Sequence, residues 1–316
     1  MNENKEEGPR EPRFPSRFPS RFPSRFPSRF PSRFPSRFPS RFPFRSPSSP
    51  PSLFANKRAL QDAIRTYIDT HGKDCPYGPI GTWDVSNLTD MSRVFMWCNT
   101  FNEPLDGWDV SNVVNMTHMF HGCHRFNQPL HTWNVPNVVD MHDMFQNCEE
   151  FNQPLATWNV SRVKNMRCMF AECRSFDQPL DTWDVSHVTD MRFMFKECRV
   201  FRHPVNTWNV SNVIHMNEMF CGCNVFNQPL ADWDVSNVTD MRYMFEGCTV
   251  FNQPLDTWNI SHRTNVSSMF YKCPAYRHNL FAWTHHLSQT QQNTLFSKAD
   301  QTRHCLKEEP FAYLLK

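Results

Sequence analysis

Cysteine offers the most chemistry in this 316-residue chain, because a thiolate can bind a metal, exchange disulfides or act as a nucleophile. Eight of the twelve cysteines recur every 25 residues, and we call them the Cys ladder: Cys98, Cys123, Cys148, Cys173, Cys198, Cys223, Cys248 and Cys273. No base stands beside these thiols in the sequence, and the spacing is not that of a zinc site. The first twenty residues hold no apolar stretch of a secretory signal, so we predict reduced, buried, structural thiols.

The other cysteines and the histidines offer few further places for a metal. We expect the cysteines off the ladder to be exposed: Cys75, Cys168, Cys221 and Cys305. Cys221 and Cys223 are the one close pair of thiols, and the histidine clusters are His285–His286 and His304–Cys305. No second pair of ligands accompanies them at zinc-finger spacing, so we predict no metal site and no cofactor.

Acidic side chains recur in two rows that interchange with asparagine. The residue after each tryptophan is Asp at 84, 109, 184 and 234 but Asn at 134, 159, 209 and 259. A second row runs through Asp90, Asn115, Asp140, Asn165, Asp190, His215, Asp240 and Asn265. A full carboxylate row would suit Ca²⁺, but Asp and Asn share only a side-chain carbonyl oxygen. We therefore predict that these oxygens accept hydrogen bonds from backbone amides in turns.

Catalytic motifs are absent from the sequence. There is no nucleophile elbow, no paired-carboxylate motif, no H-E-x-x-H and, with 8 Gly in all, no glycine-rich phosphate loop. Residues that recur in every copy of a repeat serve a need that recurs, which is stacking. We therefore predict no catalytic residues and a protein that is not an enzyme.

These rows belong to a 25-residue repeat. A typical unit reads Phe-Asn-Gln-Pro-Leu-x-x-Trp-Asp-Val-Ser-Asn-Val-x-Asp-Met-x-x-Met-Phe-x-x-Cys-x-x, and its tryptophans form a second ladder from Trp83 to Trp283. A unit this short has no core of its own, so the period predicts a solenoid of stacked coils. The predicted structural ladder comprises Trp108, Trp133, Trp158, Trp183, Trp208, Trp233 and Trp258, with Cys123, Cys148, Cys173, Cys198, Cys223 and Cys248.

Two segments of each unit predict secondary structure. Residues 233–241 alternate apolar and polar side chains for part of their length and contain β-branched residues, which indicates a short parallel strand in every coil. In residues 241–248 the apolar side chains recur at the spacing of one helical face, which indicates a short helix or helical turn. Each coil is therefore predicted to be a strand followed by a helical turn.

The unit closely resembles the BspA-like leucine-rich-repeat family, also met as the repeat of mycoplasma-type surface lipoproteins. The matching residues are Trp-Asp-Val-Ser-Asn-Val-Thr-Asp-Met at 233–241, Met244-Phe245, Cys248 and Phe251-Asn-Gln-Pro-Leu255. The resemblance extends from residue 54 to about residue 283. It implies a right-handed, leucine-rich-repeat-like solenoid that binds other macromolecules, often as an adhesin at the cell surface. With neither a signal peptide nor a transmembrane segment in the sequence, the default expectation is an intracellular protein.

The repeat sets the expected organisation of the chain. Residues 53–75 should form an N-terminal capping helix, because Asn56 can cap it and apolar residues follow at helical spacing. Residues 76–285 are the predicted solenoid of 25-residue repeats, and residues 286–316 the C-terminal cap or tail. Residues 1–52 carry a net charge of +7 and leave −5 for the rest, although the whole chain is only +2.

Residues 1–52 form a low-complexity basic arm in which Arg-Phe-Pro-Ser repeats seven times from Arg13 to Ser40. Proline at every fourth position excludes a helix, so we predict a disordered segment. Residues 13–45 hold nine arginines and no acid, which suits an anionic partner such as a nucleic acid or a membrane surface. Arginine three residues before each serine makes the following serines candidate phosphorylation sites: Ser16, Ser20, Ser24, Ser28, Ser32, Ser36 and Ser40.

Positions that vary between coils should point to solvent, because the core is the same in every coil. In the predicted helical turns these positions form a surface that we call the ridge: 117–118, 142–143, 167–168, 192–193, 217–218 and 242–243. Arginine and tyrosine are favoured at interfaces, so the predicted partner-binding residues are Arg167, Arg192, Phe193, Arg242 and Tyr243. The predicted function is that of a non-catalytic, monomeric solenoid that binds a protein partner. The alternative is a binder of nucleic acid or an anionic surface through the arm, with the solenoid as scaffold.

Overall fold

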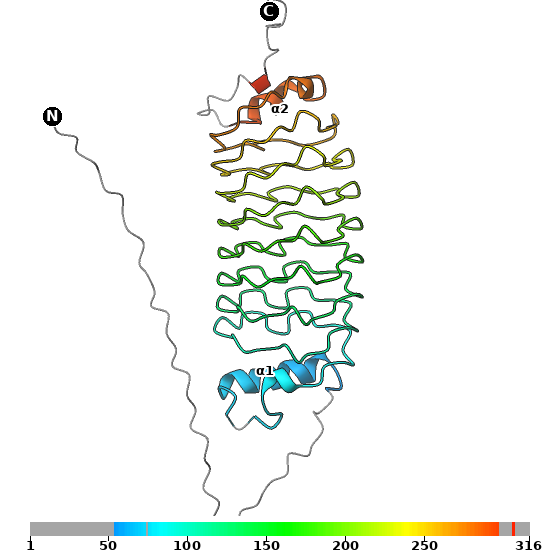
Figure 1. Cartoon of the computed structure of the whole chain (residues 1–316), viewed down its shortest axis with the longest axis vertical. Helices are drawn as coiled ribbons and strands as arrows, with labels where there is room; N and C mark the ends of the chain where they lie inside the picture. Colours follow the sequence, from blue (N-terminus) through cyan, green and yellow to red (C-terminus); the bar gives the residue numbers. More distant parts are fainter. Residues whose placement is uncertain (1–53, 74, 297–304, 307–316) are drawn as a thin grey trace, which may run out of the picture. The chain divides into compact units, whose positions relative to one another are not determined.

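The computed structural model describes residues 54–73, 75–296 and 305–306. The basic arm, its seven candidate serines and most of the expected C-terminal tail lie outside these residues. The elements are α1 (Lys57–Asp69), the 3-10 helices η1 (Ile80–Thr82) and η2 (Phe281–His285), and α2 (Gln289–Thr294). Between η1 and η2 the chain forms a repeat solenoid, with coils stacked on one another from α1 to α2 (Figure 1). None of the helices in the described residues is long and apolar enough to cross a membrane.

Each coil is built from turns. The short helix or helical turn predicted for residues 241–248 is therefore not formed, but the side chains predicted to be buried there are buried. Met241, Met244, Phe245 and Cys248 are fully buried. Tyr243 and Gly247 have positive φ angles of 57° and 71°, which a right-handed helix cannot contain. Alternate amides donate to the next coil, as Phe245 N does to Met269 O at 2.9 Å, while Met244 N and Cys248 N close local turns.

The predicted strands are likewise reduced to single paired residues. Among the described residues no strand is formed, and neighbouring coils are joined by isolated parallel bridges through the second acidic row, from Asp90–Asn115 to Asp240–Asn265. Val238 N donates to Val235 O at 2.9 Å, and this turn bends the chain within the segment predicted as a strand. The backbone therefore stays extended too briefly for a continuous ladder.

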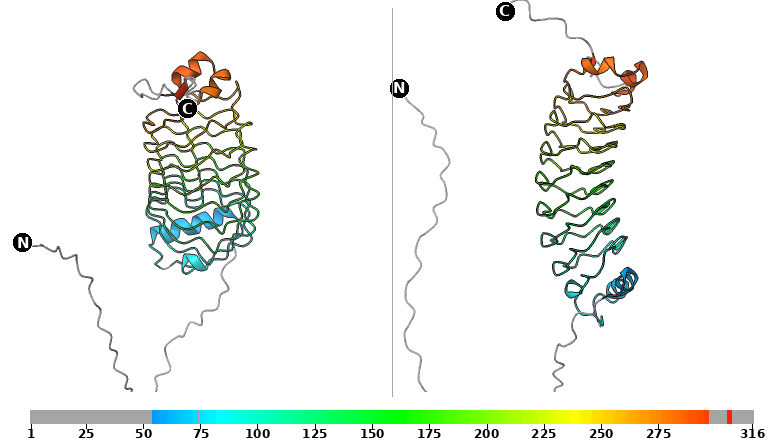
Figure 2. Two further views of the ribbon diagram at one scale, coloured as in Figure 1. Left: turned by 45° about the horizontal axis from the view of Figure 1, so that its top comes forward. Right: turned by 90° about the vertical axis from the view of Figure 1, so that its right-hand side faces the viewer.

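Parallel rows of aromatic rings fill the core along the stacking direction. Phe120 and Phe145 stack at 5.5 Å between ring centroids and 2° between ring planes. Trp133 and Trp158 stack at 6.3 Å and 7°. These separations lie in the favourable range for offset-stacked rings. Figure 2 shows the coils edge-on, each lying flat against the next, which is the arrangement that such rows require.

The ends of the core are covered by α1 and by the segment after the last coil, where α2 itself buries no residue but its neighbours are buried: Trp283, Leu287, Leu295 and Phe296. At α1 the side chain of Asn56 accepts a hydrogen bond from Ala59 N at 3.0 Å, and Leu60, Ala63 and Ile64 are buried against the first coil. Lys57 Nζ lies 2.6 Å from Asp90 Oδ2, so α1 is also tied to the second acidic row. At α2 a capping box joins Ser288 and Gln291. The two caps cover the apolar faces that the first and the last coil would otherwise expose to solvent.

Candidate binding surface

The Cys and Trp ladders supply hydrogen-bond donors to carbonyls that the stacking buries. Cys148 Sγ donates to Phe120 O at 3.0 Å, and Trp158 Nε1 donates to Leu130 O at 3.0 Å. The same bond, to the carbonyl 28 residues earlier, is made by each Cys from Cys123 to Cys248 and each Trp from Trp108 to Trp258. Burial raises the pKa of the Cys148 thiol well above its ordinary value, so the thiol keeps its proton for this bond. The ladder cysteines are therefore structural donors.

A conservative pair of substitutions tests the role of the thiol. Cys148→Ala is expected to lower the free energy of unfolding by about 1–3 kcal/mol, because Phe120 O loses its buried donor and a small void opens. Cys148→Ser keeps a donor in nearly the same place and should lose less. Urea unfolding followed by tryptophan fluorescence measures both differences. Serine as costly as alanine would contradict a role for the hydrogen bond.

The interpretation of the first acidic row as turn acceptors is confirmed at positions 84, 109, 159, 184, 209 and 234. It is wrong at Asn134, because Pro136 has no amide hydrogen, and at Asn259, because Ser261 N donates to Thr264 Oγ1 instead. Ser111 N donates to Asp109 Oδ1 at 3.0 Å, and Ser161 N donates to Asn159 Oδ1 at 3.2 Å. The hydrogen bonds from Ser111 lower the pKa of the Asp109 carboxyl. The second row behaves alike: Thr117 N donates to Asn115 Oδ1 at 3.0 Å. Asp and Asn therefore perform the same task in both rows, as acceptors for backbone amides.

The structure places the predicted binding residues on the ridge with different exposures. Arg167, Arg242 and Tyr243 are exposed, whereas Arg192 and Phe193 are half-buried. Arg192 Nε donates to Asp190 Oδ1 at 2.9 Å, and Arg242 makes the same bond to Asp240 Oδ1 at 2.9 Å. Each guanidinium is therefore held against the carboxylate two residues before it in the chain.

Not every ridge position faces solvent. The prediction that all positions that vary between coils are exposed is therefore wrong in part. The buried members are Thr117, Asp143, Cys168 and Asn217. Adjacent coils are joined by direct backbone hydrogen bonds, such as Cys168 N to Arg192 O at 2.8 Å, so a short side chain is covered by its longer neighbours in the next coil. The ridge therefore contains exposed residues such as Arg242 and Tyr243, half-buried residues such as Arg192 and Phe193, and the four buried positions.

The expectation of exposed off-ladder cysteines is also wrong for three of the four. Cys168, Cys221 and Cys305 are buried, and only Cys75 is half-buried. Burial, with Glu246 adding to it, raises the pKa of Cys221 to about 12, and burial with Asp143 raises that of Cys168 to about 12. Thiols with such pKa values stay protonated at neutral pH and are poor nucleophiles.

A row of exposed valines was missed in the sequence. Val200, Val225 and Val250 are 41%, 43% and 44% exposed and occupy the same position in three successive coils. Each lies seven residues beyond a ridge residue, at 193, 218 and 243. Exposed apolar residues that adjoin one another favour protein contact more than scattered ones do. Reading the sequence in rows of 25 would have placed these valines together.

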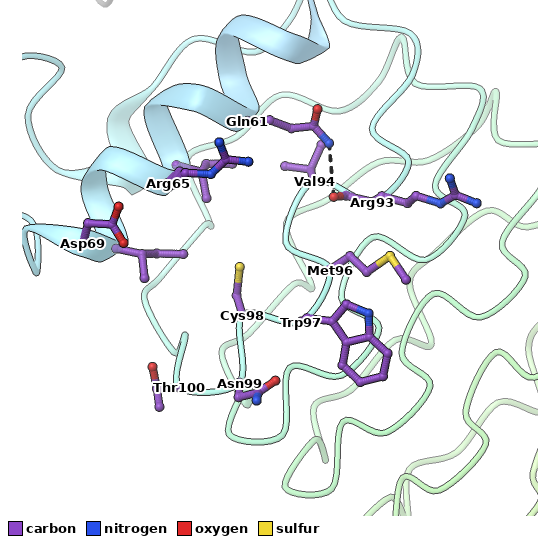
Figure 3. A pocket seen from close by; sticks show the side chains of 12 residues that line it. Gln61, Arg65, Asp69, Arg93, Val94, Met96, Trp97, Cys98, Asn99 and Thr100 are labelled. Atoms are coloured by element: carbon purple, nitrogen blue, oxygen red, sulfur yellow. Dashed lines mark hydrogen bonds between the residues drawn. The ribbon is translucent and has the colours of Figure 1, made fainter.

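A small cavity of about 370 Å³ lies between α1 and the first coil. Figure 3 shows Arg65 and Asp69 on α1 facing Cys98 and Trp97 of the first coil, with Gln61 Nε2 donating to Arg93 O at 3.2 Å. Burial raises the pKa of Cys98 to about 11, so this thiol is not activated. The cavity contains no nucleophile with its base, and we assign it no catalytic chemistry.

Three histidines from neighbouring coils lie close together, which was not predicted from the sequence: His118, His121 and His142. His118 and His142 have ring centroids 4.8 Å apart, and His118 and His121 lie 5.5 Å apart. Desolvation lowers the pKa of both His118 and His121. His118 and His142 are 24 positions apart along the chain, and they lie close together because adjacent coils stack with a period of 25 residues. His285 and His286 belong to no such group of ligands among the described residues, and His304 lies outside those residues.

The comparison with known proteins gives a family and no closer relative. No curated protein and no solved structure matches this chain. Three overlapping segments, residues 66–177, 129–217 and 196–308, match one family profile, described as "Mycoplasma protein of unknown function, DUF285". Successive matches over a 25-residue repeat agree with the solenoid of stacked coils. Since the matched segments extend from residue 66 to residue 308, the chain belongs to this family of mycoplasma-type repeat proteins.

Proposed function

We propose that the chain is a non-catalytic solenoid that binds a protein partner through the ridge, in an adhesin-like or host-interaction role. The observation that carries the proposal is an arginine followed in the chain by an exposed or half-buried aromatic residue, Arg192–Phe193 and Arg242–Tyr243, at the same position of two coils. Arginine and tyrosine are enriched among the residues that dominate binding energy at protein interfaces. The finer assignment to the BspA-like leucine-rich-repeat group is part of the same proposal.

The geometry of the pairs supports recognition more than core packing. Tyr243 is 38% exposed. Lys196 Nζ lies 5.4 Å from the centroid of the Phe193 ring and 2.7 Å from Glu218 Oε2, so a cation and a carboxylate flank this ring. An aromatic ring surrounded by charged groups is the usual make-up of an interface centre with a polar rim. The valine row 200, 225 and 250 supplies further apolar area.

The test measures binding and folding on the same variants. Alanine at Arg192, Phe193, Arg242 and Tyr243 together is expected to weaken partner binding at least tenfold, because aromatic and arginine anchors contribute most of the affinity. The melting temperature should remain close to that of the parent. The partner is first isolated with the full chain as bait, and affinity is measured by surface plasmon resonance. A variant that loses stability but not affinity would contradict the proposal.

The second candidate is binding to an anionic polymer or surface through the basic arm. The nine arginines of residues 13–45, without any acid, favour it. Deleting residues 1–52 separates the two candidates in the same experiment. Loss of most salt-sensitive binding upon this deletion would favour the arm, whereas unchanged partner binding would favour the ridge.

A further inference from the structure

The sheltered part of the ridge brings two imidazoles and a carboxylate together. His118 Nε2 lies 3.5 Å from Asp143 Oδ2, and His142 Nε2 lies 3.9 Å from the same oxygen. One ligand atom from each of the three residues lies within 4.8 Å of the other two, and no other such group occurs in residues 54–73, 75–296 and 305–306. His118 belongs to one coil, and His142 and Asp143 belong to the next.

These separations suit a small divalent transition metal. Zinc binds histidine nitrogen and carboxylate oxygen at about 2.0–2.2 Å, so two ligands at the tetrahedral angle lie roughly 3.3–3.6 Å apart. The His118–Asp143 pair already has this separation. The His142–Asp143 pair is a few tenths of an ångström longer and the two histidine nitrogens lie within 4.8 Å, so metal binding would draw the three side chains closer together. Three protein ligands leave the fourth position for water.

A second carboxylate orients one of the imidazoles. His142 Nδ1 lies 2.8 Å from Asp140 Oδ1, and His142 N donates to the same oxygen at 3.0 Å. Because a carboxylate can only accept, Nδ1 carries the proton, and the lone pair of Nε2 is directed toward Asp143. In the metal-free protein a proton on Nε2 would make this contact an ion pair, and a bound metal ion would take the place of that proton. Histidine ligands of metals are commonly held in this way by a carboxylate on the other ring nitrogen.

The surroundings shelter the group without closing it. The side chains of His118, His142 and Asp143 are 18%, 26% and 10% exposed, respectively. The Cys168 thiol of the following coil lies beside Asp143, and burial together with this carboxylate raises the pKa of the thiol. An ion can thus reach the three ligand atoms from the ridge surface while the carboxylate remains largely dehydrated.

We propose that His118, His142 and Asp143 bind a first-row divalent transition metal such as Zn²⁺, which links two adjacent coils of the solenoid. Asp140 is a positioning residue for His142. The ligand set contains two imidazoles and one carboxylate, which fits Zn²⁺, Co²⁺ or Ni²⁺ better than Ca²⁺ or Mg²⁺, because the latter prefer oxygen ligands.

The experiment uses the full chain, stripped of metal with a chelator and titrated with Co²⁺ or Zn²⁺. We expect one Co²⁺ per chain with visible d–d absorption of a tetrahedral site, and displacement of that spectrum by Zn²⁺. Asp143→Asn should weaken the affinity at least 100-fold through loss of a ligand. Asp140→Asn should weaken it about 10- to 100-fold through loss of the orienting carboxylate. His131→Asn, at an exposed histidine of the same coil as His142, is the matched control and should change nothing.

The variants are chosen so that folding does not obscure the result. Position 143 has φ of 56°, a conformation that asparagine tolerates. Position 140 is asparagine in the coils on either side, at Asn115 and Asn165. Near-ultraviolet circular dichroism of the metal-free variants checks their folds. Wild-type protein that takes up no Co²⁺ at micromolar concentration, or an Asp143→Asn variant that binds as tightly as the wild type, would overturn the proposal.

Discussion

Replacing Trp158 with alanine is expected to lower the free energy of unfolding by about 3–5 kcal/mol. The indole is 3% exposed, stacks on Trp133 at 6.3 Å and packs against Phe145 at 6.2 Å. Alanine would leave a cavity between neighbouring coils, and Leu130 O would lose its donor Trp158 Nε1. In a solenoid each coil contacts only its neighbours, so the loss falls on one coil and its two interfaces.

Two further substitutions divide this effect into packing and hydrogen bonding. Trp158→Phe keeps an aromatic ring in the stack but cannot donate to Leu130 O, and we expect a loss of about 1–3 kcal/mol. Val225→Ala, at an exposed position, should change stability by no more than about 0.5 kcal/mol. Guanidinium unfolding monitored by far-ultraviolet circular dichroism gives all three values. An alanine variant no less stable than the Val225 control would show that the Trp ladder does not hold the coils together.

The sequence is most informative about what the core contains. The spacing of Met241, Met244, Phe245 and Cys248 identifies buried residues correctly, because burial depends on a pattern that every coil repeats. The helix predicted from the same spacing is wrong, because the third and seventh residues of the segment have positive φ. The seventh residue of this segment is glycine in three coils, at 122, 222 and 247, and glycine there indicates a turn. In other coils the same position holds Trp97 or Glu197, which gives no such indication.

Side chains on the ridge are harder to predict, because their environment depends on the neighbouring coil. Asp143 is buried since His118 and His142 lie against it, whereas Tyr243 occupies the same position of its coil and is exposed. A single unit of the repeat contains no information on such pairs. Aligning residues 25 apart recovers them, and this operation would have shown both the valine row and the histidine group.

Removal of one complete 25-residue coil is expected to leave a folded protein. Removal of 24 residues is expected to disrupt the fold. Deleting residues 217–241 joins Met216 to Arg242, and the sequence Met-x-x-Met-Phe continues without interruption. Glu197, which packs against Gly222 in the parent, then faces Gly247, another glycine in the same position. Phe195 stacks on Phe245 instead of Phe220. The shortened solenoid keeps every type of contact and loses one interface.

Deleting residues 218–241 leaves one extra residue between two core methionines. The alternate amides that donate to the next coil, such as Phe195 N, which donates to Met219 O in the parent, would then be out of step, and core side chains would change places with ridge side chains. We expect the 25-residue deletion to unfold cooperatively at a moderately lower temperature and to keep its near-ultraviolet tryptophan signal. The 24-residue deletion should lose that signal or aggregate. Equal stability of the two shortened chains would contradict a solenoid whose coils are held in register by the core, because such a register permits only whole repeats to be removed.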